Sequence, residues 1–416
     1  ERDLRREGIM SKSTEHLIIN DNDEKKTQKM TSENSRTIGL VFISLLLDLL
    51  AFTMILPLLP SLLDYYDKEE GKGTSLYATL LGAVQSFQKL TGAPEKFASV
   101  LFGGALGSMY SFLQFLTSPI VGSLSDAYGR KPMLLLCLIG IASSHALWGF
   151  ASTFSVFVLA RFIGGLSKAN VSLSMAVVAD ASNEKSRARG MALVGLAFSI
   201  GFIVGPLAGA WFAKNNDNTF GLWGERPAFY ASALSLANIV LVFFYLPESL
   251  PKEKRAPLGF TLSKSLDYIS PWQLLKFSAV KNLSEHQNKV LSKLGLIYFL
   301  YLFIYSGLEF TITFLTHHTF NYSAMQQGKM FLVIATAFAV SCMTSMAAGQ
   351  APPAARGAVL GALRSLGALA RAMGPLLTAS GNDTFTVYWC SGAAITYTIG
   401  SVILIIPAVM LFRLKS

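Results

Sequence analysis

Gly122-Ser-Leu-Ser-Asp-Ala-Tyr-Gly-Arg-Lys-Pro132 is a short basic stretch between two long apolar runs, Leu101–Val121 and Pro132–Phe150. Each run has roughly the 20 residues that a membrane-spanning helix needs. The stretch therefore predicts a tight turn at one face of a membrane. Arg130 and Lys131 place that face in the cytoplasm, because short cytoplasmic loops carry an excess of Lys and Arg.

The same stretch carries a recognisable motif, Gly-x-Leu-x-Asp-x-x-Gly-Arg-Lys, which resembles the signature loop of the major facilitator superfamily. An ordinary positive-inside turn is the alternative interpretation. The resemblance implies an all-α membrane protein with two helical bundles around a central cavity and a gate at this loop. Gly122 and Gly129 allow a turn or a close approach of backbones, and the Asp126 carboxylate suits the start of another helix. The matching residues are Gly122, Leu124, Asp126, Gly129, Arg130 and Lys131.

Composition agrees with a polytopic membrane protein. The chain has 416 residues, of which 52% are hydrophobic and 14% charged, against about 25% charged in a typical soluble domain. The net charge of +10 fits basic cytoplasmic loops and gives no reason to expect a nucleic-acid partner. Cys137, Cys342 and Cys390 support neither a disulfide framework nor a metal cluster. We expect no metal, no cofactor and no enzymatic activity.

The apolar runs predict about ten spans and four regions. Residues 1–36 form a disordered cytoplasmic tail, 37–247 a six-helix bundle, 248–293 a cytoplasmic linker, and 294–416 an incomplete second bundle of about four spans. Both termini are then cytoplasmic. Pro57 and Pro60 should end the first span, and residues 83–90 have the pattern of a short amphipathic helix in an outer loop. The spans are 37–63, 101–121, 132–150, 153–178, 190–212, one ending at 246, 294–316, 330–347, 357–378 and 386–412.

An internal repeat suggests that two spans are missing. Ala188–Gly201 resembles Ala355–Gly367, and both segments then reach a Gly-Pro pair. Parallel halves are typical of this superfamily. From residue 101 to residue 190 the first half has 89 residues, whereas the matching interval of the second half, from 329 to 357, has 28. The difference of 61 residues is enough for two spans, so the chain has ten where the family pattern has twelve.

Four further segments resemble one eukaryotic branch of the superfamily, over residues 36–330 and again over 342–375. The missing block is the main departure from that branch. The segments are Leu47-Asp-Leu-Leu-Ala-Phe-Thr53, Gly164-Gly-Leu-Ser-Lys-Ala-Asn-Val-Ser172, Tyr301-Leu-Phe303 with Gly307-Leu-Glu309, and Arg364-Ser-Leu-Gly-Ala-Leu-Ala-Arg371.

Ionisable residues inside predicted spans are the candidate substrate and proton pathway. Each would cost a few kcal/mol facing lipid, so each should face a partner or water. Asp48 lies about 16 Å into its span, at 1.5 Å per residue, and Lys168 also falls near the middle of a span. Mutual neutralisation across helices is the alternative, and Arg161 and Arg364, nearer the membrane edges, could also snorkel. The candidates are Asp48, Arg161, Lys168, Glu309, Arg364 and Arg371.

The fifth span contains Gly201-x-x-x-Gly205-Pro206-x-x-Gly209. Small residues four apart let two helices approach closely in any bundle. The pattern also resembles the motif of antiporters in the superfamily, with Ala210 in place of the last glycine. His317 and His318, at the outer end of the seventh span, are predicted to be ordinary surface histidines.

These observations favour a monomeric secondary transporter of small organic solutes that works by alternating access in the lipid bilayer. Four cations against two acids inside the spans favour an organic anion, and Asp48 favours proton coupling. The alternative is a non-transporting scaffold, receptor or inactive truncated isoform, because of the missing spans. The sequence does not distinguish the plasma membrane from an organelle membrane.

Overall fold

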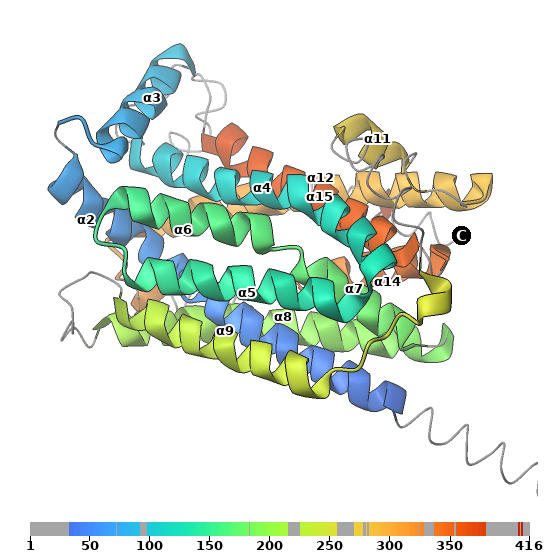
Figure 1. Ribbon diagram of the computed structural model, residues 1–416. Coiled ribbons are helices and arrows are strands. Elements are labelled where there is room, and N and C mark those ends of the chain that lie inside the picture. Colours follow the sequence, from blue (N-terminus) through green and yellow to red (C-terminus); the bar gives the residue numbers. More distant parts are fainter. Residues whose placement is uncertain are drawn as a thin grey trace, which may run out of the picture.

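A computed structural model describes residues 33–71, 73–91, 98–182, 184–214, 225–255, 270–277, 280, 283–323, 325–327, 337–352, 355–379, 407 and 409–410. Every regular element in these ranges is a helix, and the long helices run side by side in one elongated bundle (Figure 1). Six of the described helical segments are long and apolar enough to cross a membrane. The predicted tail 1–36 lies outside the description except for residues 33–36, as does nearly all of the predicted last span, 386–412.

After a first helix over residues 33–53, the elements follow in chain order. They are η1 (Leu56–Leu58), α2 (Leu59–Glu70), α3 (Leu76–Thr91), α4 (Ala98–Tyr128), α5 (Arg130–Gly149), α6 (Phe154–Ser167), α7 (Asn170–Asp180), α8 (Glu184–Lys214), α9 (Glu225–Tyr245), η3 (Lys252–Lys254), α11 (Pro271–Lys276), α12 (Glu285–Phe320), α14 (Ala337–Gln350) and α15 (Arg356–Ala379).

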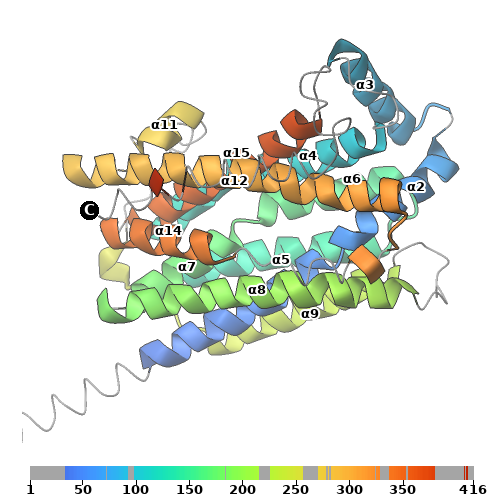
Figure 2. The same cartoon turned by 180° about the vertical axis from the view of Figure 1, so that it is seen from behind.

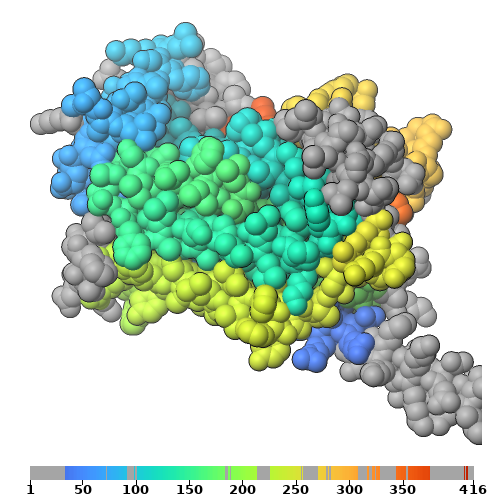
Figure 3. All heavy atoms as spheres, viewed as in Figure 1, coloured from blue at the N-terminus to red at the C-terminus, as the bar shows by residue number. Residues whose placement is uncertain are grey.

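The first span does not end at its prolines. Pro57 and Pro60 occupy the first turns of η1 and α2, and the helical path continues to Glu70. The first turn of a helix tolerates proline because its N–H groups have no helical partner. Beyond α2 the chain forms α3, which is longer than the predicted 83–90 and projects from one end of the molecule (Figure 3).

The predicted turn over residues 122–132 is mostly helical. α4 continues through it to Tyr128, and the direction changes at Gly129 alone, whose φ of 109° is a conformation that suits glycine. Gly122 therefore lies inside a helix. The sequence allowed Gly122 and Gly129 either to form a turn or to let two backbones approach closely. Gly129 forms the turn, and Gly122 allows the close approach of two helices.

The predicted fourth span is interrupted at Lys168. α6 ends at Ser167, Lys168 and Ala169 form a non-helical junction, and α7 begins at Asn170. Arg161 therefore lies inside α6, whereas Lys168 is the residue at which α6 ends. Non-helical backbone within a membrane is tolerated where protein surrounds it, and Ala169 and Asn170 are almost completely buried.

The second half is built from α12, α14 and α15. α12 begins at Glu285, nine residues before the predicted span, because Ser284 and Gln287 form a capping box there. It runs the length of the bundle (Figure 2). α14 overlaps the second part of the predicted span 330–347 and continues beyond it to Gln350, while residues 330–336 lie outside the description. α15 packs along α4, where Ser108 donates to the Ala372 carbonyl and Ser365 to the Phe115 carbonyl.

Candidate functional site

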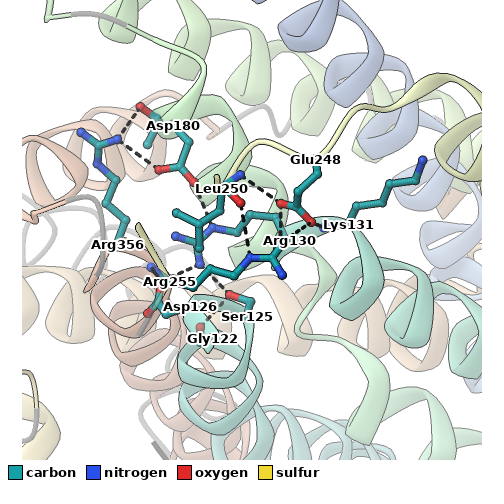
Figure 4. A network of polar contacts seen from close by, with 12 residues as sticks. Gly122, Ser125, Asp126, Arg130, Lys131, Asp180, Glu248, Leu250, Arg255 and Arg356 are labelled. Carbon is teal, nitrogen blue, oxygen red and sulfur yellow. Dashed lines mark hydrogen bonds and ion pairs between the residues drawn. The ribbon is translucent and has the colours of Figure 1, made fainter. Parts of the chain in front are cut away.

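The signature stretch forms a buried ionic network centred on Arg130 (Figure 4). The Arg130 side chain is fully buried. Its Nη1 lies 2.6 Å from Asp126 Oδ1, and its Nε lies 3.0 Å from Asp180 Oδ2 at the end of α7. Nη1 also donates to Ser125 Oγ at 2.7 Å. One guanidinium group thus joins α4, α5 and α7, which is the planar, multidentate geometry that favours Arg over Lys.

Asp126 also contacts the start of α15, as its sequence context predicts. The backbone N–H groups of Gly357 and Ala358 donate to its two carboxylate oxygens at 3.1 and 2.9 Å. A carboxylate at this position satisfies helix N–H groups that lack helical partners and complements the helix dipole. Arg356 adds a second link, from its Nη1 to Asp180 Oδ1 at 3.1 Å. Together these bonds join the two halves of the chain at this end.

Glu248, directly after the sixth predicted span, accepts bonds from the start of α5. The N–H groups of Arg130 and Lys131 donate to its carboxylate at 2.9 and 3.2 Å. A Cβ at Gly129 would lie 2.5 Å from Glu248 Oε2 and 2.8 Å from Arg255 Nη2. Glycine is therefore required at position 129 for two reasons. Its positive φ suits a residue without a Cβ, and the Glu248 carboxylate occupies the space that a Cβ would need.

Gly122 lies where α4 and α15 come closest. A Cβ at 122 would clash with the Gly357 carbonyl oxygen and lie 3.1 Å from Gly361 Cα. A Cβ at Gly361 would lie 2.6 Å from the Ser118 carbonyl oxygen. Glycines on both helices thus allow the two backbones to touch beside Asp126, as small residues do in membrane helix pairs.

A second polar cluster lies at the interruption between α6 and α7. Lys168 Nζ is 2.8 Å from Asp48 Oδ2, and the two side chains are 5% and 1% exposed. Lys168 Nζ also lies 4.4 Å from the centre of the Phe52 ring. Asp48 Oδ1 has no hydrogen-bond partner among the described residues. The two mid-span charges that the sequence singled out therefore form one buried pair.

Two of the predicted arginines approach aromatic rings instead of carboxylates. The Arg161 guanidinium lies 5.7–5.8 Å from the rings of Tyr110, Trp148 and Phe157. Arg364 lies 5.6 Å from the Phe198 ring, with Nη1 3.4 Å from the Tyr298 hydroxyl. Within the described part of the chain neither has a carboxylate partner, and both are buried, so neither snorkels to an edge.

The remaining candidates have other surroundings. Arg371 Nη2 donates to Gln114 Oε1 at 3.0 Å. Glu309 belongs to α12, and its side chain lies outside the description. Gly201, Gly205 and Gly209 face the first helix and the residue after it, where added Cβ atoms would collide with Leu49, Thr53 and Met54. Pro206 lies inside α8 without ending it. The glycine motif is thus a packing surface between two helices of the first half.

Comparison with known proteins explains this arrangement. The profile of the Major Facilitator Superfamily matches residues 41–345. The chain belongs to the major facilitator superfamily. It is 40% identical to human major facilitator superfamily domain-containing protein 10, over 91% of this chain and 93% of that protein. The branch suggested by the four sequence segments, that of the tetracycline transporter-like protein, is therefore confirmed.

A solved structure and a bacterial relative extend the comparison. The crystal structure of the human organic anion transporter MFSD10 (TETRAN) superposes with a TM-score of 0.79, covering 91% of this chain and 99% of that one. Multidrug resistance protein 2 of Bacillus subtilis is 31% identical over 53% of this chain and 50% of its own length. The all-α major facilitator architecture and an integral membrane location follow.

The length of the alignment to the human protein can be compared with the deficit of 61 residues in the internal repeat. It covers 445 positions, but 91% of the 416 residues is about 379, so about 66 positions of the human protein face gaps in this chain. That number is close to the deficit of 61 residues that the internal repeat indicates. The alignment length does not say where these positions fall, so the incomplete second bundle of about four spans stays a prediction.

Several residues of the two clusters had no role assigned from the sequence. Gln114 was a polar residue in an apolar run, and Asp180, Glu248 and Arg356 were charges at helix ends. Their position at those ends was a usable signal, because helix termini have backbone groups that need partners. Their partners were not predictable, since Asp126 and Gly357 are 231 residues apart.

An ion pair joins the two halves at the opposite end of the molecule. His317 of α12 has Nε2 3.1 Å from Asp64 Oδ2 of α2 and Nδ1 3.3 Å from the Tyr322 carbonyl oxygen. Both neighbours are acceptors, so only the doubly protonated imidazolium can donate to both. The bond to Asp64 raises the pKa of His317 above its ordinary 6.5. The contact is then complete below pH 6.5 and is lost as the pH rises through the raised pKa.

We expect this end of the molecule to open as the pH is raised. Spin labels at Ser86→Cys on α3 and Gln326→Cys beyond α12 should report a longer distance at pH 8 than at pH 5.5. Half-exposed pairs contribute about 0–1 kcal/mol, so the populations should shift no more than about fivefold. His317→Gln should abolish the pH dependence, whereas His286→Gln, at the other end of α12, should preserve it. An unchanged profile in His317→Gln would contradict the assignment.

Proposed function

We propose that the chain is a secondary transporter of small organic anions that couples their movement to protons by alternating access. The supporting observation is the excess of buried cations. Asp48 is matched by Lys168, while Arg161 and Arg364 face no described carboxylate. Buried charges inside a membrane protein mark substrate or ion pathways. The solved relative is itself described as an organic anion transporter.

The two clusters have separate tasks in this proposal. The signature network closes one side of the membrane, which we take to be the cytoplasmic side with both termini. The Lys168 cluster receives the solute and the proton. A monomer in lipid suffices, because both clusters lie within one chain. Gly201, Gly205, Pro206 and Gly209 maintain the packing of the first half.

The Asp48–Lys168 ion pair predicts the direction in which pH changes anion binding. Protonation of Asp48 releases Lys168 for a solute carboxylate, so anion binding should tighten as the pH falls. The antiport implied by the glycine motif would give the opposite pH dependence, and the same binding measurement separates the two.

Uptake into proteoliposomes tests the function. Radiolabelled benzoate should enter in preference to tetraethylammonium. We expect weak flux by the chain as it stands, because the sequence repeat predicts that two spans of the second half are missing. We expect strong benzoate flux once the corresponding block of the human relative is inserted between Met330 and Ala347. A restored protein that moves only the cation would refute the charge argument.

A non-transporting scaffold, receptor or inactive isoform is the second candidate, favoured by the roughly 66 alignment positions absent from this chain. It predicts no flux dependent on Lys168, even after the insertion. Robust benzoate flux by the chain without the insertion would exclude this candidate and also the argument from the gap.

Asp48→Asn tests proton coupling separately. The neutral amide cannot carry a proton, so benzoate uptake driven by a pH gradient should fall to the level seen without a gradient. Benzoate exchange at equal pH should persist. Both fluxes are measured in the same vesicles of the span-restored protein. If uptake still responds fully to the gradient, another group carries the proton.

A further inference from the structure

One amide side chain bridges the two halves of the molecule at its centre. Gln114 of α4 is 4% exposed. Its Nε2 donates to the carbonyl oxygen of Lys168 at 3.1 Å, and its Oε1 accepts from Arg371 Nη2 of α15 at 3.0 Å. Gln114 therefore connects an arginine of the second half to the interruption beside the Asp48–Lys168 pair.

The Gln114 amide matters because it bonds to the backbone at the interruption between α6 and α7. Lys168 is the C-cap of α6, and backbone bonding resumes beyond it with Leu173 N–H to Ala169 O. A carbonyl at a helix end needs a partner, and within a membrane protein water does not readily supply one. Gln114 supplies it. The position of the Lys168 backbone, and with it the reach of Lys168 Nζ to Asp48, thus depends on the Gln114 amide.

The amide also has a fixed polarity. Its NH2 end only donates and its oxygen only accepts, so both bonds form in one orientation. The bond from Arg371 is charge-assisted and therefore the stronger of the two types. If a solute carboxylate takes Arg371 Nη2, Gln114 loses the partner that holds its orientation.

We infer that Gln114 is the positioning residue that couples anion binding at Arg371 to protonation of Asp48. This inference rests on the proposed function. When the anion draws Arg371 away, Gln114 turns, the Lys168 carbonyl loses its donor and Lys168 moves from Asp48. Asp48, whose Oδ1 already has no partner among the described residues, then takes a proton from water. Linkage makes the effect reciprocal, so protonation of Asp48 strengthens anion binding.

The pH dependence of benzoate binding tests the inference in the chain as it exists. We expect the benzoate Kd to fall with decreasing pH, by at most about tenfold per pH unit for one linked proton. Gln114→Met keeps the volume but removes both hydrogen bonds. In this variant the benzoate Kd should vary by less than about twofold between pH 5 and 8. Isothermal titration calorimetry in detergent gives both profiles.

A second variant and a control complete the design. Gln114→Leu also removes both hydrogen bonds and adds no titratable group, so its Kd should also be flat. Thr117→Val, which removes a hydroxyl bonded only within α4 to Leu113 O, should keep the wild-type profile. A merely structural Gln114 would lower the melting temperature and leave the slope intact.

The outcomes separate this inference from the proposed function. A wild-type slope retained in Gln114→Met or Gln114→Leu overturns the inference while anion binding stands. A benzoate Kd that does not vary with pH in the wild type also overturns the inference. Absence of benzoate binding to the wild type at every pH overturns the proposed function itself.

Discussion

Gly122→Leu is expected to hold the transporter open at the signature-loop end. A side chain at 122 collides with the Gly357 backbone and with Gly361, so α4 and α15 must separate. The bonds from Gly357 and Ala358 N–H to Asp126 are then lost. Each charge-assisted bond contributes about 1.5–3 kcal/mol, so the closed population should fall by at least about tenfold. Ser118→Cys, buried between these helices, should become reactive to a thiol reagent in an otherwise cysteine-free protein.

Gly39→Leu is the matched control, because a Cβ at Gly39 meets nothing within 4 Å. It should leave Ser118→Cys protected. Asp126→Asn should shift the population in the same direction as Gly122→Leu but less far, since it removes the charge and preserves the helix contact. If Ser118→Cys labels equally in Gly122→Leu and Gly39→Leu, the glycine contact does not control the gate.

Lys168→Ala should weaken anion binding strongly and abolish transport. The change removes the cation that we propose to bind the solute carboxylate. It also removes the ion-pair partner of the buried Asp48 carboxylate. Loss of a charged contact weakens binding by about 10–100-fold, and breaking a buried pair destabilises a protein by about 3–5 kcal/mol. Benzoate affinity and melting temperature in detergent should therefore both fall. Lys168→Arg retains the charge and should keep part of the binding.

A double variant separates function from stability. Asp48→Asn combined with Lys168→Met removes both charges, so the melting temperature should recover most of what Lys168→Ala loses. Benzoate binding should stay as weak as in Lys168→Ala, because no cation replaces Lys168. Recovery of binding in the double variant would show that Lys168 serves only to neutralise Asp48.

Much of the signature site could be predicted from the residues themselves. The sequence predicts that Asp126 lies at the start of another helix, and the structure places it at the start of α15. The predicted turn over residues 122–132 was too long. Residues 122–128 continue α4, and the chain changes direction at Gly129 alone. The residues around Arg130 that were not assigned, Asp180 and Glu248, carry no local signal for their partner, since hydropathy does not show which helix ends meet.

The sequence by itself determined that this chain is a helical membrane protein with charges held inside it. Long apolar runs must form helices in lipid, because each backbone group needs a partner there, and a charge that interrupts such a run must be shielded. Only the tertiary structure decided how those charges are matched. Lys168 sits at a break in the helix and pairs with Asp48, Arg161 lies among aromatic rings, and Gln114 links Arg371 to the Lys168 carbonyl. These contacts join residues far apart in the chain, so they follow from helix packing and not from local pattern.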